Sequence, residues 1–418
     1  MTATDSAASN TGNGSTPTET EEEFRTRCHA FLTEQATGLI FDLPDPRGAN
    51  ELDAAKLFQQ QVADAGLAGI TYPTEYGGQG LPKSYDRIWR EEYAKHHDMT
   101  GQLTISHGMC VPMLAEYGTD QQKAAYLADA IAGRTVWCQM FSEPGAGSDV
   151  ASLQTKAELD GEEWTLNGQK VWTTLAHVSD YGIIIARTDP EVSKHAGISM
   201  FIIDLNSPGV EIRAINQIDG GQHFNEVFFT DVRLPANALI GELNAGWRLA
   251  TAMLMYERVA IGTGSSSGIK TPTSDFLIKT ARANGKADDP VTRQALMQIH
   301  AEEMTKSLVS LRTRAELKAG KTPGPGGSLG KLHGAKIARL SRLLMMNLAG
   351  PAGAAWVDED EARYANSTLR SFSSNIAGGT DEIQKNIIGD RVLGLPRDIA
   401  VDRDVAFKDL KVGTQSSS

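Results

Sequence analysis

The sequence has few cysteines and no long apolar run, and both shortages restrict the class of protein. Its three cysteines, Cys28, Cys110 and Cys138, are odd in number and widely spaced. They therefore offer neither a disulfide framework nor the CxxC ligand pairs of a structural zinc site. No stretch approaches the roughly 18 apolar residues that cross a membrane. We expect a cytoplasmic protein without a metal site and without membrane insertion.

Positive charge is also in short supply. The 418-residue chain carries a net charge of −12, because 52 acidic residues outnumber 40 Lys and Arg. Nucleic-acid binding depends on a basic surface that neutralises phosphates, so we expect no nucleic-acid partner. Residues 1–20 contain neither an apolar run nor any Lys or Arg. We expect this segment to be a disordered tail and not a targeting signal.

The periodicity of the apolar residues changes twice along the chain. From 21 to 135 they recur every three or four positions, which predicts an N-terminal helical domain. Gly66 and Gly133 follow two of the periodic segments and are typical of helix ends. The expected helices cover 24–35, 54–66, 85–97 and 119–133.

Residues 136–240 are predicted to form a β-domain. Apolar and polar residues alternate over 153–174, and the dipeptides Asp160-Gly161 and Asn167-Gly168 interrupt the alternation. Such dipeptides are strong hairpin signals, because type I′ turns require positive φ at both central residues. Further strands are expected at 181–188, 198–205 and 226–235. The pattern predicts antiparallel hairpins.

Helical spacing resumes over 241–400, which predicts a C-terminal four-helix bundle. A GP-rich flexible loop is expected at 320–330, and 401–418 is expected to be a C-terminal extension. The expected helices are 246–262, 292–320, 331–350 and 381–394, the last with Thr380 as its N-cap. The fold class is therefore α+β multidomain, with the β-domain between two helical domains.

Three motifs, in this order and at this separation, resemble the acyl-CoA dehydrogenase family. They are 142-SEPGAGSD-149, 168-GQKVWTT-174 and 378-GGTDEIQKNIIGDRVLGLPR-397. The resemblance covers about 21–397 and is greatest to bacterial, especially actinobacterial, members. It implies an acyl-CoA dehydrogenase-like fold, FAD as cofactor and the introduction of an α,β double bond into an acyl-CoA.

The residues of these motifs suit a flavin chemically. The isoalloxazine ring has a flat apolar face and an edge of N and O atoms, so an aromatic neighbour and short donors match it. Trp172 supplies the aromatic neighbour, and Ser142 and Thr174 supply the short donors. The resemblance places Thr174 near the reactive nitrogen N5. Gly145 and Gly147 permit close backbone approach. Taken alone, Trp172 has a simpler interpretation as a packed aromatic of the β-domain.

The resemblance also implies the remaining contacts. Thr380 and Glu382 would contact the flavin at the N-terminus of the last helix, where free N–H groups favour negative charge. Arg282 would reach the flavin pyrophosphate of a neighbouring subunit, although the stretch 280–290 lacks the Phe of the family pattern. The cofactor-binding set is Gln139, Met140, Phe141, Ser142, Ser148, Trp172, Thr173, Thr174, Arg282, Thr380 and Glu382. The substrate-binding set is Ser148, Tyr256, Arg258 and Gly378.

In many family members the catalytic base is a glutamate that stands just before the Gly-Thr of the C-terminal motif. This chain has Gly378 at that position, and glycine cannot act as a base. A subset of the family, including members that act on branched acyl chains, takes the base from the first helix of the C-terminal bundle. The matching stretch 255-MYERV-259 makes Glu257 the candidate catalytic residue.

The surroundings of Glu257 leave two interpretations open. Helical spacing places Met253, Tyr256 and Ala260 on its face, and apolar neighbours raise a carboxyl pKa from about 4.3 toward neutrality, which suits a general base. The structural interpretation is an ion pair with Arg258 or a salt bridge within the bundle. The chain would then be a non-catalytic partner subunit of a hetero-oligomeric dehydrogenase.

The resemblance implies an acyl-CoA substrate, an electron-transfer flavoprotein as electron acceptor and a homotetramer, with a hetero-oligomer and a flavin-dependent oxidase as alternatives. Gly378 and Gly379 leave room near the reacting carbons, which indicates a branched or steroid-like chain. A hydrolase is not favoured: 264-GSSSG-268 and 326-GGSLG-330 match G-x-S-x-G but lack a preceding strand, and we expect both in flexible loops. No GxGxxG follows a strand, so a Rossmann fold is not expected.

Overall fold

The computed structural model describes residues 19–39, 50–96, 98–262, 271–319, 326–355, 359–396, 402 and 404–410. The described residues fall into two compact units. The first draws on Met1–Thr100 and Asp120–Thr135, and the second on Gly101–Thr119 and Val136–Ser418. The exact boundaries of the three expected domains stay a prediction.

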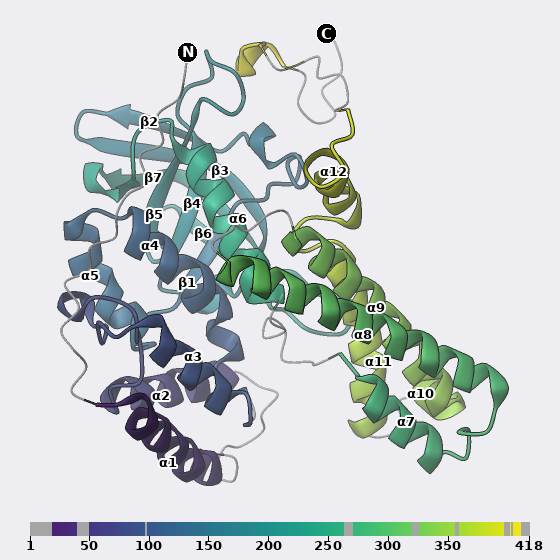
Figure 1. Ribbon diagram of the computed structural model, residues 1–418. Helices are drawn as coiled ribbons and strands as arrows, with labels where there is room; N and C mark the ends of the chain where they lie inside the picture. Colours follow the sequence, from purple (N-terminus) through teal and green to yellow (C-terminus); the bar gives the residue numbers. More distant parts are fainter. Residues whose placement is uncertain are drawn as a thin grey trace. The chain divides into compact units, whose positions relative to one another are not determined.

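The first unit is helical (Figure 1). The four helices predicted from the apolar spacing are confirmed: α1 (Glu21–Leu39), α2 (Asn50–Asp64), α3 (Lys83–Tyr93) and α5 (Asp120–Ile131). Phe24, Phe58 and Ile88 lie fully buried between them. Gly66 and Gly133 have φ of +66° and +70°, the left-handed conformation that ends a helix with least strain in glycine.

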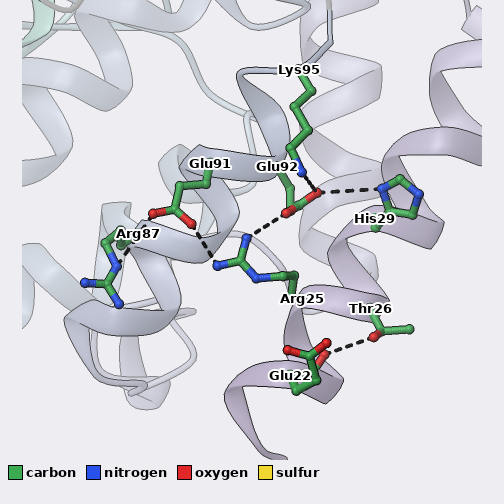
Figure 2. A network of polar contacts seen from close by, with 8 residues as sticks. All are labelled: Glu22, Arg25, Thr26, His29, Arg87, Glu91, Glu92 and Lys95. Carbon is green, nitrogen blue, oxygen red and sulfur yellow. Dashed lines mark hydrogen bonds and ion pairs between the residues drawn. The ribbon is translucent and has the colours of Figure 1, made fainter.

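A carboxylate buried in the first unit joins α1 to α3 (Figure 2). The Glu92 side chain is 2% exposed and accepts from Arg25 Nη1 at 2.7 Å and from Lys95 Nζ at 2.6 Å. His29 Nδ1 lies 3.6 Å from the same carboxylate. Arg25 also donates to the exposed Glu91 at 2.7 Å. The cations around Glu92 compensate for its burial, because an unpaired charge there would be strongly destabilising.

The second unit contains an eight-stranded sheet with the order β6-β7-β3-β2-β4-β5-β8, and β1 pairs with β4. The ladders are antiparallel except for the parallel pairs β1–β4 and β2–β4. Trp164, Leu166, Phe201 and Val227 belong to the buried cluster at its centre. The strands are β1 (Trp137–Met140), β2 (Lys156–Asp160), β3 (Glu163–Thr174), β4 (Tyr181–Arg187), β5 (Ile198–Asp204), β6 (Val210–Ala214), β7 (Phe224–Pro235) and β8 (Leu239–Ile240).

One of the two predicted hairpin turns is confirmed and the other is wrong. Gly161 has φ +67° in the tight turn that pairs Asp160 with Glu163. Asn167 and Gly168 form no turn, because β3 continues through them and pairs with β7 across a register shift. A Cβ on Gly168 would lie 2.7 Å from the Cα of Thr155. Glycine is therefore required at this bulge by the close approach of Thr155, which directly precedes β2.

The helices of the second unit include the four that the periodicity predicts after residue 240, which are α6, α8, α9 and α12. The π-helix η3 and the helices α4, α7, α10 and α11 were not predicted. The segment 326–330 belongs to a helix and not to the expected loop, whereas 264–268 lies outside the described residues. The helices are the π-helix η3 (Ser106–Cys110), α4 (Val111–Tyr117), α6 (Gly246–Gly262), α7 (Ser274–Ala283), α8 (Pro290–Lys318), α9 (Gly326–Ala349), α10 (Pro351–Ala355), α11 (Glu359–Arg370) and α12 (Asp381–Arg391).

Among the described helices, none combines the length and apolar character that a membrane crossing requires.

We expect Glu92→Gln to lower the free energy of unfolding by about 1–3 kcal/mol at neutral pH, because Arg25 and Lys95 lose a buried partner. Lys95, together with Arg25, holds the pKa of the Glu92 carboxyl below its usual value of 4.5, although burial opposes this. The pair therefore stabilises the fold above about pH 4.5 and stops doing so as the pH falls through the lower pKa of the folded state.

Thermal unfolding measured between neutral and acidic pH checks this expectation. The control is Glu91→Gln, which removes the neighbouring, 48% exposed partner of Arg25 and should cost no more than about 0.5 kcal/mol. Equal losses in the two variants, or a loss in Glu92→Gln that persists at acidic pH, would contradict the account.

Candidate functional site

The small-residue loop 142–149 is anchored by a buried ion pair. The side chains of Glu143 and Lys170 are 6% and 0% exposed, and Lys170 Nζ lies 2.7 Å from Glu143 Oε1. Lys170 Nζ also donates to the carbonyl oxygen of Phe141 at 3.1 Å. The carboxylate of Glu143 accepts from the backbone N–H groups of Gln154 and Thr155 at 2.6 and 3.0 Å. One carboxylate thus connects the end of β1, the start of β2 and the middle of β3.

Glu143 is therefore a structural acid. Burial alone would raise its pKa, but the Lys170 ammonium and the bonds from Thr155 and Gln154 outweigh burial and hold that pKa below its usual value. The carboxylate stays ionised and in place at neutral pH.

Next to this pair, a bulge in β3 turns Trp172 out of the sheet. The register with β7 shifts between Lys170 and Thr173, and Trp172 has φ +61°. Its side chain is 59% exposed and meets Phe224 edge-on at 6.1 Å between ring centroids. A left-handed tryptophan costs about 1–2 kcal/mol, so the bulge displays the ring at an energetic cost. The exposed ring does not fit the packed-aromatic interpretation.

Two buried polar atoms of β1 and β3 have no hydrogen-bond partner among the described residues. The buried Nε2 of Gln139 and the buried Oγ1 of Thr173 form no hydrogen bond within the described ranges. Each such atom costs about 1–3 kcal/mol unless a ligand satisfies it. A Cβ built on Gly145 or Gly147 would meet nothing within 4 Å, so there is free space above the loop. A flat ligand with a polar edge, such as a flavin, fits these residues.

The other predicted cofactor residues of the sheet differ in exposure. Ser142 is half-buried, and its carbonyl accepts from Val171 N at 2.9 Å, so it lies beside Trp172. Thr174 is half-buried and pairs with Phe224. Ser148 is exposed in the loop. The side chains of Met140 and Phe141 are buried, so only their backbone faces the site.

The candidate base Glu257 lies on α6, and one helix, η3, links α6 to β1. The π-helix η3 packs against both α6 and β1. Glu257 is half-buried, one helical turn beyond the fully buried Met253. Tyr256 Oη donates to a carboxylate oxygen of Glu116 on α4. The side chain of Arg258 lies outside the described part, so its substrate contact stays a prediction.

At the start of α12, two glycines with left-handed backbone occupy the place where many family members carry the glutamate. Gly378 and Gly379 have φ of +68° and +84°, where an L side chain is strained. Gln384 is fully buried and donates to the carbonyls of Gly378 and Gly379 at 2.8 and 3.3 Å. Thr380 is confirmed as the N-cap, since its Oγ1 accepts from Ile383 N at 3.2 Å. The site would then have to obtain its base from another element.

Two further predicted cofactor residues, Glu382 and Arg282, are exposed on helices of the second unit. Glu382 is exposed in the first turn of α12. Arg282 is exposed in the last turn of α7, which packs against α8 and α9, and its contact with the flavin pyrophosphate of a neighbouring subunit stays a prediction. A cavity of about 520 Å³ opens between this end of α7 and α9–α10. Its lining includes Thr280, Asn284 and Lys286.

Sequence reasoning missed an ion pair that joins the C-terminal helices to the sheet. Arg370 at the end of α11 pairs with Asp219, whose side chain is 2% exposed. Burial would raise the pKa of Asp219, but Arg370 and the N–H of Gly221 outweigh it and lower that pKa. In the loop between β6 and β7 that carries Asp219, the carbonyl of His223 accepts from the N–H of Leu175 at 2.8 Å. Leu175 directly follows β3. The pair spans 151 residues, so no local pattern reveals it.

Comparisons with known proteins agree with this architecture. Three family models match: the acyl-CoA dehydrogenase N-terminal domain at 18–134, the middle domain at 138–232 and the C-terminal domain at 244–393. Acyl-CoA dehydrogenase IpdE1 of Mycobacterium tuberculosis is 36% identical over 90% of this chain and 98% of its own length.

Solved structures give the same result. The ChsE4-ChsE5 complex from Mycobacterium tuberculosis matches with a TM-score of 0.71 and 28% identity, over 92% of this chain and 99% of that one. The Tcur3481-Tcur3483 steroid ACAD matches with a TM-score of 0.74 and 25% identity, over 90% of this chain and 98% of that one.

We expect Lys170→Met to destabilise the protein by about 3–5 kcal/mol, because it leaves Glu143 buried without its cation. Adding Glu143→Gln should restore part of the loss, because no charge then remains buried. Chemical denaturation of the two single variants and the double variant measures the coupling energy. Strictly additive losses would show that the pair does not hold the loop.

Proposed function

The chain belongs to the acyl-CoA dehydrogenase family, and from that premise we propose that it oxidises a branched or polycyclic acyl-CoA with FAD as cofactor and Glu257 as base. The observation that carries the proposal is the outward-turned Trp172 beside the anchored loop 142–149. A dehydrogenase of this family forms an α,β double bond in an acyl-CoA thioester. The residue roles below are our inference.

We assign cofactor binding to the bulge and the loop. Trp172 would lie against the flat ring, and Ser142 and Thr174 would bind its polar edge. The unpaired amide of Gln139 and hydroxyl of Thr173 would gain partners there. When bound, FAD supplies the acceptor for the hydride that leaves the substrate β-carbon. FAD is favoured over a smaller flavin by the family and by the predicted pyrophosphate contact at Arg282.

We assign proton removal to Glu257. Forming the double bond requires a carboxylate that takes the α-proton, and Gly378 offers none. Glu257 lies half-buried on α6, one helical turn after the fully buried Met253. The N–H of Gly378 would donate to the thioester oxygen, where negative charge develops. The Tyr256–Glu116 hydrogen bond joins α6 to α4 and would keep Glu257 aimed at the substrate.

A bulky acyl chain is favoured on two grounds. Gly378 carries no side chain, so it would leave space beside the reacting carbons. The expectation is wrong for Gly379, because a Cβ there would lie 2.7 Å from Nε2 of Gln384. Among the solved relatives, one is a steroid ACAD. An acyl-CoA with a branched or fused-ring chain is therefore the substrate class that we infer for this chain.

For its partners we infer an electron-transfer flavoprotein, as is general in the family, and further dehydrogenase subunits. Met297, Met304, Leu308 and Leu311 are each at least half exposed on α8. Their spacing of seven, four and three residues gathers them on one helix face. Such an apolar stripe suits a subunit interface. A homotetramer is the simplest assembly, and a complex of unlike chains, as in the ChsE4-ChsE5 relative, is the alternative.

We expect Glu257→Gln to retain the cofactor and to bind the thioester, but to lose the proton-abstraction step by a factor of about 10² or more. Rapid mixing with acyl-CoA, followed through the flavin absorbance, measures that step directly. Glu211→Gln, which changes an exposed glutamate of β6, serves as the control and should leave the step unchanged. Normal reduction of the cofactor in Glu257→Gln would assign the base to another residue.

We expect the purified chain to carry flavin absorption bands and to lose most of its flavin in Trp172→Ala, which removes the exposed ring. Absorption spectra of the protein fraction after desalting check this. The exposed, remote Leu159 gives a control, Leu159→Ala, that should keep the colour. A colourless chain that gains flavin only with a second, different subunit would favour the non-catalytic partner subunit.

A further inference from the structure

A short C-terminal segment lies against the connection between β4 and β5. We call the described residues 402 and 404–410 the C-terminal strap. The N–H of Phe407 donates to the carbonyl of Val192 at 2.8 Å, and the N–H of Lys408 donates to Pro190 at 3.0 Å. Phe407 is 6% exposed. The strap is therefore packed and hydrogen-bonded on the sheet domain, more than two hundred residues away in sequence.

Phe407 contacts an arginine that also holds the loop of the proposed cofactor site. The guanidinium carbon of Arg187 lies 3.6 Å from the centroid of the Phe407 ring. Arg187 Nη2 donates to the carbonyl of Ala151 at 2.6 Å, and Nη1 donates to the carbonyl of Lys194 at 2.6 Å. Ala151 lies in the short helix Val150–Ser152 that ends the loop. The Phe407 ring thus covers the guanidinium of Arg187, and an N–H group of the same guanidinium holds the end of the loop at Ala151.

A second connection runs through charges. Lys194 Nζ lies 3.0 Å from Asp149 in the loop and 2.7 Å from Asp402 in the strap. The Lys194 side chain is only 14% exposed, and its ammonium is shared between the two carboxylates. Ser152 Oγ donates to the same Asp149 at 2.5 Å. The strap and the loop are therefore joined at two points, Arg187 and Lys194.

We propose that the C-terminal strap is a positioning element of the cofactor site, which acts through Arg187 and Lys194 to fix residues 148–152. The inference rests on the proposed function for the identity of the ligand, but the mechanical coupling stands without it. Ser148 precedes Asp149 directly, so loss of the strap would move a predicted cofactor and substrate contact. Phe407 and Asp402 belong to neither the predicted cofactor-binding set nor the predicted substrate-binding set, so we assign them a positioning role.

A purely local role for the strap makes a different prediction. If Phe407 served only to cover the β4–β5 connection, its loss would loosen 188–197 and leave 145–153 unchanged. If the strap positions the site, its loss loosens both segments. The exchange of backbone amides separates these outcomes, because it reports each segment on its own and does not depend on turnover.

The experiment compares full-length Phe407→Ala and Asp402→Asn with the parent protein by hydrogen exchange, in the presence and absence of added FAD. We expect amides of 145–153 to exchange at least about threefold faster in Phe407→Ala, with a smaller rise in Asp402→Asn. The matched control is Lys408→Ala, which breaks the exposed pair of the strap with Glu191 and should leave 145–153 unchanged. FAD affinity should fall with the faster exchange.

Unchanged exchange of 145–153 in Phe407→Ala, with faster exchange confined to 188–197, would overturn the proposal. Should Phe407→Ala fail to fold, Asp402→Asn decides alone, because this substitution keeps the size of a half-buried side chain and leaves the core closed. Faster exchange in a protein that binds no FAD would support the strap and contradict the cofactor assignment. Failure of the strap proposal and failure of the cofactor assignment therefore give different results.

Discussion

The buried ion pair of Lys170 and Glu143 is the interaction on which the proposed site depends. Burying both charges is costly, and the pair is tolerated because Phe141, Gln154 and Thr155 satisfy the remaining hydrogen-bonding capacity. Its members come from the loop after β1 and from the middle of β3. The pair therefore sets where the small-residue loop runs relative to the strand that carries Trp172. Without it, neither the free space above the loop nor the aromatic ring beside it would be fixed.

Around that pair, the sheet uses irregularities of β3 to present a binding surface. Gly168 lets the strand pass close to Thr155, and the second register shift turns Trp172 outward at φ +61°. Arg370 and Asp219 connect the loop before β7 to the C-terminal helices, which also provide α12 and its two left-handed glycines. The strained backbone and unpaired polar atoms lie at the proposed site, where a ligand would offset their cost.

Much of the fold followed from periodicity and turn chemistry, because both are local. Two dipeptides, one between β2 and β3 and the other within β3, show where local reasoning stops. Asp160-Gly161 turns, while Asn167-Gly168, with an equal local preference, is held straight by pairing with β7 and by the approach of Thr155. The loop, Trp172 and Thr380 could be selected from motif resemblance. The pairs Lys170–Glu143 and Arg370–Asp219 could not, because their partners meet only through the tertiary fold.

The central claim is that the anchored loop and Trp172 bind the flavin on one side of the thioester while Glu257 stands on the other. A diffraction structure with FAD and an unreactive thioether analogue of a branched acyl-CoA tests it most directly. The account predicts the ring system against Trp172 and Thr174, and a Glu257 carboxylate oxygen about 3–3.5 Å from the α-carbon. A Glu257 side chain turned to solvent, with another carboxylate at the α-carbon, would contradict it.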